Sequence, residues 1–105
     1  MTDVPKTASV IPFGMPRPVA LELIRTLVAA DEFALEPKAK MNIRQRDFTM
    51  RQVLLTLKEG QINQGPKRDE CNDWRCRLTK RCAGSIVHVV VAIHDESFVY
   101  VISVH

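Results

Sequence analysis

Apolar side chains recur at helical spacing through the first sixty residues of the chain. A helix is predicted over about Pro18 to Ala30, because five apolar residues fall on one of its faces. A second, shorter helix is predicted from Pro37 to about Arg44. Both begin with proline, whose missing N–H costs nothing in the first turn of a helix. The apolar face of the first helix consists of Ala20, Leu23, Ile24, Leu27 and Val28.

A third predicted helix has recognisable signals at both ends. Thr49 is a suitable N-cap, and Gln52 three residues later completes a capping box, with Phe48 and Val53 at the positions of a hydrophobic staple. Gly60 is expected to end the helix in the left-handed conformation that helix termini often need. The buried stripe should consist of Met50, Val53, Leu54 and Leu57.

The spacing of apolar residues changes to every second position from Trp74 onward, which is typical of half-buried strands. The stretch before it, Asn63 to Asp73, is polar and is predicted to be a loop. After the first strand, Lys80 to Ser85 should form a turn, and two further strands are predicted over Ser85 to His94 and Phe98 to Val104.

Helices followed by strands predict an α+β fold, in which two to three N-terminal helices pack on one face of a three- to four-stranded antiparallel sheet. A length of 105 residues suits one domain. Residues 1–16 are punctuated by proline and are expected to be a flexible N-terminal tail, whereas residues 17–105 should form the single α+β domain.

Alternation along the strands assigns side chains to the two faces of the sheet. In the last strand, the bulkier set that includes Tyr100 is expected to be buried. On the helix side we expect Trp74, Cys76, Leu78, Val87, Val89, Val91, Ile93, Tyr100, Ile102 and Val104. On the open side we expect Arg75, Arg77, Thr79, Arg81, Ile86, His88, Val90, Ala92, His94, Val99, Val101, Ser103 and His105.

Positive charge is concentrated in the middle of the chain. The net charge is +3, but residues 38–81 hold twelve Lys or Arg and five Asp or Glu, a net of +7, while the segments on either side each sum to −2. This distribution favours a polyanionic partner, above all nucleic acid. A basic surface that is merely solvated is the alternative.

The predicted open face combines arginines with His88 and His105, which is the chemistry that RNA cleavage through the ribose 2′-hydroxyl requires. That reaction needs a base, an acid and cations beside the phosphate. Imidazole serves either proton role near pH 7, and the guanidinium fork matches phosphate oxygens. The alternative is that the arginines are a solvated strand face and that His88 is packed with its ring nitrogens satisfied.

No metal or other cofactor is predicted. Cys71, Cys76 and Cys82 have the spacing C-x4-C-x5-C rather than C-x2-C, and even with His88 as a fourth ligand they do not form a recognisable zinc motif. We expect free thiols. The sequence contains neither an export-type signal nor an apolar run long enough to span a membrane, so a cytoplasmic location without membrane contact is expected.

The stretch Met41 to Ile62, with Arg46-Asp47-Phe48-Thr49 and Gly60-Gln61-Ile62, resembles the helical part of a small bacterial family, domain of unknown function 4258 (DUF4258). Gly84 before a valine-rich strand and the final Val101-Ile102-Ser103-Val104 agree with it, and the resemblance covers about residues 33–105. It implies a compact fold similar to the RelE and MqsR toxins, which cut messenger RNA and are neutralised by a cognate antitoxin.

In that family a helix carries a His, an Arg four residues later and a second Arg four further on. The corresponding residues here are Lys38, Asn42 and Arg46, so only the last one matches. Lysine acts as a general base only where burial or nearby cations lower its pKa. The candidate catalytic residues are His88, His105, Arg46 and Lys38. The candidate RNA contacts are Arg75, Arg77, Lys80 and Arg81.

Three functions therefore stay open. The first is a metal-independent endoribonuclease with RNA as its substrate. The second is a non-catalytic RNA- or protein-binding module that uses the same basic surface. The third is a protein whose basic face merely meets an acidic antitoxin or a partner helix.

Overall fold

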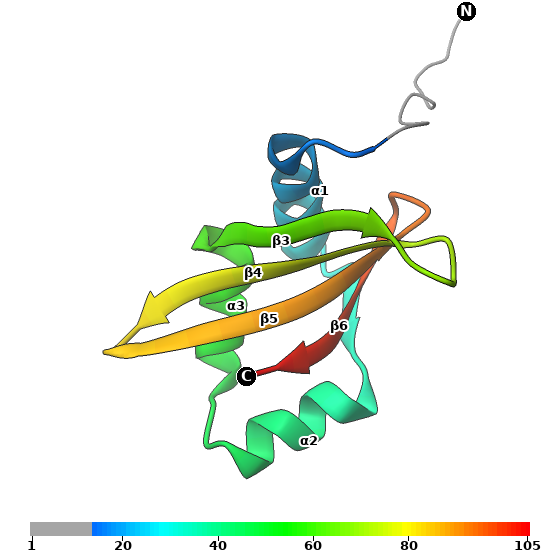
Figure 1. Cartoon of the computed structure of the whole chain (residues 1–105). Coiled ribbons are helices and arrows are strands. Elements are labelled where there is room, and N and C mark those ends of the chain that lie inside the picture. Colours follow the sequence, from blue (N-terminus) through cyan, green and yellow to red (C-terminus); the bar gives the residue numbers. More distant parts are fainter. Residues whose placement is uncertain (1–13) are drawn as a thin grey trace, which may run out of the picture.

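The computed structural model describes residues 14–105, and in this part of the chain three helices and a five-stranded sheet form an α+β fold (Figure 1). The elements are α1 Arg17–Ala29, β2 Phe33–Leu35, α2 Pro37–Gln45, α3 Met50–Glu59, β3 Gln61–Arg68, β4 Trp74–Cys82, β5 Ser85–His94 and β6 Phe98–Val104. Residues 1–13 of the predicted tail lie outside the described residues. Met15, at its end, is buried in the core, so the packed domain begins before residue 17.

The sheet has the strand order β2-β6-β5-β4-β3 and is mixed, because β2 runs parallel to β6 while the other neighbours are antiparallel. The prediction of three to four antiparallel strands was therefore wrong at both edges. β2 has only three residues, too few to show a period. Most of β3, Gln61–Arg68, falls within the predicted loop 63–73, and the strand was missed because it buries one apolar residue, Ile62, and contains Gly65 and Pro66.

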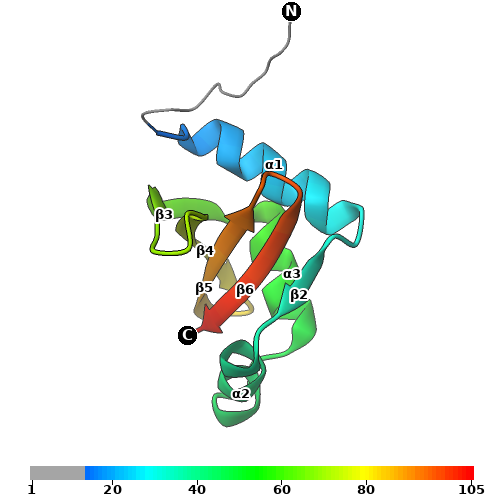
Figure 2. The ribbon, with the colours of Figure 1, turned by 90° about the vertical axis from the view of Figure 1, so that its right-hand side faces the viewer.

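Helices α1 and α3 lie behind the sheet in Figure 1, and α2 lies apart from them, against the end of β6 (Figures 1 and 2). α3 packs on β4 and β5, and α1 packs on α3 and β3. The predicted face of α1 is confirmed at Ala20, Ile24 and Val28, which are buried. One sheet face is thus covered by two helices, and the other is left open with α2 beside one end of it.

The capping box predicted for α3 is present. The Thr49 side chain accepts a hydrogen bond from the Gln52 backbone N–H at 3.1 Å, and the Gln52 side chain accepts one from the Thr49 N–H at 2.9 Å. The predicted stripe was wrong at Met50, which is 42% exposed, because the buried face turns toward Thr56 instead. The Thr56 hydroxyl tolerates burial because it donates to the Gln52 carbonyl at 2.8 Å.

Gly60 ends α3 for a reason other than the one predicted. Its φ of −72° and ψ of 172° are extended rather than left-handed. A Cβ at this position would lie 2.5 Å from the Thr56 carbonyl oxygen and 2.9 Å from that of Thr79. Glycine is therefore needed for close approach between the end of α3 and β4.

The turn between β4 and β5 is shorter than the predicted Lys80 to Ser85. Cys82 pairs directly with Ser85, so only Ala83 and Gly84 connect the strands, and both have positive φ. This is the geometry of a two-residue hairpin, whose twist matches that of its strands. Lys80 and its neighbours are consequently part of β4.

β6 contains a bulge, and the residues before it face the opposite sides of the sheet from those predicted. Val90 lies opposite Ser103 and Val91 lies opposite Val101, so Ile102 is the extra residue. Val99 and Val101, predicted on the open side, are fully buried, whereas Tyr100 is only partly buried on the open side opposite Ala92. Beyond the bulge the parity returns to the predicted one. Val104 therefore faces the core and His105 faces the open side.

Candidate functional site

The two histidines of the open face lie side by side. The His88 N–H donates to the His105 carbonyl at 2.7 Å, and the His105 N–H donates to the His88 carbonyl at 2.8 Å. Their ring centroids are 5.5 Å apart, with the ring planes inclined by 32°. Residues seventeen positions apart in the sequence thus present adjacent imidazoles, and the bulge in β6 is what turns His105 to this side.

Helix α2 brings two further cations to this pair. The Asn42 side-chain oxygen accepts a hydrogen bond from the Val104 N–H at 3.1 Å, which fixes α2 against the end of β6. Lys38 and Arg46 lie four residues before and after Asn42, so they share its side of the helix. Arg46 is the C-cap of α2. Lys38 and Arg46 are thereby near enough for their charges to act on His105, although the sequence separates them from it by more than fifty residues.

The electrostatics of the cluster act on His105. Burial first, and then the positive charges of His88, Arg77, Arg46 and Lys38, lower the pKa of His105 below its ordinary value. Both effects disfavour the imidazolium form. At neutral pH His105 is therefore an uncharged imidazole surrounded by cations, which is the form that accepts a proton. We refer to His88, His105, Lys38, Arg46 and Arg77 as the histidine cluster.

His88 carries a polar atom without a protein partner. Its Nδ1 is buried and makes no hydrogen bond within residues 14–105. The alternative prediction of a packed histidine with satisfied nitrogens was thus wrong at this atom. A buried polar atom without a partner costs roughly 1–3 kcal/mol, a cost that purely structural positions normally avoid.

The predicted RNA contacts divide between the two sides of β4. Arg75, Arg77 and Arg81 extend from the open face, and Arg75 and Arg81 are exposed. Lys80 has the opposite parity and forms an ion pair with Glu59 of α3, at 3.3 Å between Nζ and Oε1. The structure thus separates Lys80 from the three arginines with which it was grouped.

Arg75 and Arg77 are each held by a neighbouring side chain through Nε. The Arg77 Nε donates to Asn63 Oδ1 of β3 at 3.0 Å, and the Arg75 Nε donates to Asp69 Oδ2 of the β3–β4 loop at 3.4 Å. Neither Asn63 nor Asp69 was recognised from the sequence, because both fall in the predicted loop. The run of charges after Gly65-Pro66 was the only signal for them.

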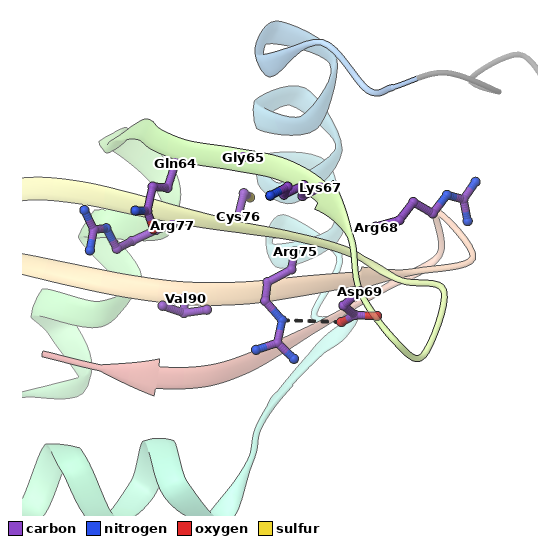
Figure 3. A pocket seen from close by; sticks show the side chains of 9 residues that line it. All are labelled: Gln64, Gly65, Lys67, Arg68, Asp69, Arg75, Cys76, Arg77 and Val90. Carbon is purple, nitrogen blue, oxygen red and sulfur yellow. Dashed lines mark hydrogen bonds and ion pairs between the residues drawn. The ribbon is translucent and has the colours of Figure 1, made fainter.

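A basic pocket of about 540 Å³ opens beside these two arginines, between β3 and β4 (Figure 3). Arg77 lines this pocket and its charge also acts on His105, so the pocket and the histidine cluster share this side chain. The lining residues are Gln64, Gly65, Lys67, Arg68, Asp69, Arg75, Cys76, Arg77 and Val90.

The cysteines are free thiols, with Cys76 and Cys82 buried and Cys71 exposed. Burial raises the pKa of the Cys76 thiol to about 12, so it is an inert hydrophobic residue. Within residues 14–105, no three His, Cys, Asp or Glu side chains are grouped so that they could hold a metal ion. None of the helices in this part of the chain is long and apolar enough to cross a membrane.

Comparison with known proteins gives one match. The profile of a family described as Domain of unknown function (DUF4258) matches residues 37–105, which extend from α2 to the end of β6. The matched region therefore contains every residue of the histidine cluster and of the pocket. No curated protein and no solved structure matches the chain.

Proposed function

Since the chain belongs to the DUF4258 family, we propose that it is a toxin-like, metal-independent endoribonuclease with a RelE-like fold that acts on RNA across its open sheet face. The observation that carries the proposal is the pair of adjacent imidazoles, His88 and His105, with the positive charges of Arg77, Arg46 and Lys38 acting on His105. These groups supply a base, an acid and charge stabilisation, which are the components that 2′-hydroxyl attack needs.

In the proposed reaction, neutral His105 accepts the proton of the ribose 2′-hydroxyl. The 2′-oxygen then forms a bond to the adjacent phosphorus while the bond from phosphorus to the 5′-oxygen breaks. His88 acts as the general acid and donates a proton to that leaving oxygen. The products are a 2′,3′-cyclic phosphate and a 5′-hydroxyl, and Arg77, Arg46 and Lys38 stabilise the charge that develops on the phosphate oxygens.

The proposal is tested with purified protein, single-stranded RNA and EDTA. Cleavage should continue in EDTA and should leave 2′,3′-cyclic phosphate ends, and DNA of the same sequence should stay intact because it lacks the 2′-hydroxyl. A His88→Ala/His105→Ala double variant, purified in the same way, controls for contaminating ribonuclease. Absence of cleavage by the wild-type protein, or equal cleavage by the double variant, would refute the proposal.

A non-catalytic module is the second candidate, and one observation favours it. Where the family usually carries an Arg, this chain has Asn42, whose side chain is engaged by the Val104 N–H. The basic face would then bind RNA, or an acidic antitoxin-like protein, without chemistry. Salt-sensitive RNA binding that is never accompanied by cleavage would select this candidate.

A further inference from the structure

The basic pocket between β3 and β4 is only partly used by the proposed reaction. Of the residues that line it, Arg77 belongs to the histidine cluster, and the others come from β3, the β3–β4 loop, β4 and β5. Lys67, Arg75 and Arg77 contribute three positive charges, and Asp69 contributes one negative charge. The guanidinium of Arg68, which also lines the pocket, is stacked on Trp74 and donates to Asn72. The pocket is therefore a concave cationic surface next to a proposed cleavage centre.

The guanidinium groups of Arg75 and Arg77 are prepared to bind an anion. Each is fixed through Nε, by Asp69 and by Asn63, while within residues 14–105 the terminal nitrogens of both make no hydrogen bond. A terminal pair of N–H donors held in position is the group that binds a phosphate bidentately. Fixing the side chain beforehand also reduces the entropy lost when a ligand binds.

Asp69 is suited to hold Arg75 because it stays ionised. Burial alone would raise its pKa, but the backbone N–H groups of Asp73 and Cys71 and the charge of Arg75 outweigh burial and lower the pKa of this carboxyl. The two backbone groups donate to Oδ1 at 3.0 and 2.9 Å, and this leaves Oδ2 for Arg75. Asp69 therefore acts as an anchor inside an otherwise cationic pocket.

The geometry of the strands places the cations at intervals along the pocket. Arg75 and Arg77 are two residues apart on one face of β4, which corresponds to roughly 6.8 Å. Lys67 of β3 lies opposite Arg75 in the register, and Gln64 lies opposite Arg77. At Gly65, a Cβ would lie 2.6 Å from the Arg75 carbonyl oxygen, so β3 approaches β4 too closely for a side chain at this point. Val90 of β5, opposite Arg77 in the register, contributes an apolar surface (Figure 3).

We propose that this pocket is a subsite for one nucleotide next to the cleaved bond of a single-stranded RNA, with Arg75 and Lys67 as ligands of its phosphate. The inference rests on the proposed function, since Arg77 is what joins the pocket to the histidine cluster. A volume of about 540 Å³ exceeds that of a phosphate alone and falls within the ~300–1,000 Å³ typical of small-ligand sites. Asn63 and Asp69 act as positioning residues for the two arginines.

Binding to the pocket is measured with a probe that the protein cannot cleave. Fluorescence anisotropy of a labelled single-stranded DNA oligonucleotide reports affinity alone, because the probe lacks the 2′-hydroxyl. Arg75→Ala should weaken binding at least about tenfold and reduce the slope of log affinity against log salt by roughly 0.7, the value for one phosphate on a single strand. Arg75→Lys, which keeps the charge but not the fork, should give an intermediate loss. Arg51→Ala, an exposed arginine of α3 on the other side of the sheet, is the matched control and should change affinity less than twofold.

The positioning role has its own readout. Asn63→Ala removes no charge, so it should leave the salt slope unchanged but weaken binding several-fold, and it should raise KM for RNA without changing kcat. If Arg75→Ala and Asn63→Ala both keep the affinity and KM of the wild-type protein while RNA cleavage continues, the subsite is overturned and the nuclease proposal stands. If these variants lose affinity but the wild-type protein never cleaves RNA, the pocket is supported as a nucleotide-binding site and the nuclease proposal is refuted.

Discussion

At the scale of single residues, His105 is the group whose state decides the proposed chemistry. It reaches the open face through the bulge at Ile102, and burial and the surrounding cations keep it neutral. A sequence pattern predicted its side of the sheet but not its environment, because Lys38 and Arg46 approach it only through the docking of α2. The hydrogen bond from the Val104 N–H to Asn42 fixes that docking and has no signal in the sequence.

The pH dependence of cleavage follows from the lowered pKa of His105. A base must be neutral, so the acidic limb of kcat/KM, the decline along which the base becomes protonated, should lie below ~6.5, the ordinary value for histidine. Lys38→Met should move the decline to higher pH, because one of the charges that disfavour the imidazolium form is removed. Lys40→Met, which alters an exposed lysine of α2 that does not act on His105, should not move it. A wild-type decline centred at or above ~6.5 would contradict the account.

Asn42 makes a contact that can be tested by stability alone. Asn42→Ala should destabilise the protein by roughly 1–3 kcal/mol, because the Val104 N–H loses its acceptor at the junction of α2 and β6. Gln45→Ala, an exposed change on the same helix, should stay within about 0.5 kcal/mol of the wild type. Urea titration measures both. Equal stability of all three proteins would mean that this hydrogen bond does not hold α2 in place.

At the scale of elements, local signals located α3 and β5 well and the sheet edges poorly. The capping box at Thr49 and the alternation of Val87, Val89, Val91 and Ile93 depend on neighbouring residues alone, and both are confirmed. β3 has no such alternation, since its backbone pairs with β4 while its side chains stay mostly exposed. The pocket was therefore not predictable, because it lies between β4 and a strand that the pattern did not reveal.

The capping box and the core of α3 should differ in what they contribute to stability. Thr49→Ala should cost ~1 kcal/mol, the usual effect of losing an N-cap. Leu57→Ala should cost ~2–5 kcal/mol, because Leu57 is fully buried and the change leaves a cavity. Met50→Ala, at an exposed position of the same helix, should cost much less than Leu57→Ala. Denaturant titrations that rank Met50→Ala with Leu57→Ala would contradict the orientation of this helix.

The ion pair of His94 and Asp73 joins the end of β5 to the residue before β4 and should make stability depend on pH. The His94 Nδ1 lies 2.7 Å from the Asp73 carboxylate, and this hydrogen bond raises the pKa of His94. A histidine with a raised folded pKa contributes stability below its unfolded pKa of ~6.5 and loses that contribution as pH rises through the folded value. His94→Gln should therefore lower the free energy of unfolding at pH 5.5 and have little effect at pH 8.5. A larger loss at pH 8.5 than at pH 5.5 would contradict this sign.

At the scale of the whole molecule, the two faces of the sheet differ in what covers them. α1 and α3 bury one face and supply the stability of the domain. The open face carries the arginines and the two histidines, and α2 flanks it (Figure 1). Composition predicted a basic protein, and alternation predicted a basic face. The assembly of the histidine cluster depended on contacts between distant segments, which no local pattern reports.

The measurement that tests the central claim most directly compares cleavage and binding in a single variant, His105→Ala. Single-turnover cleavage of single-stranded RNA in EDTA gives the rate of the chemical step, and anisotropy with a DNA oligonucleotide of the same sequence gives the affinity. Because a proton-transfer group acts chiefly in the transition state, the rate should fall by about 10²–10⁴ while the affinity changes less than about twofold. An unchanged rate, or a loss of affinity as large as the loss of rate, would contradict the assignment of His105 as the general base.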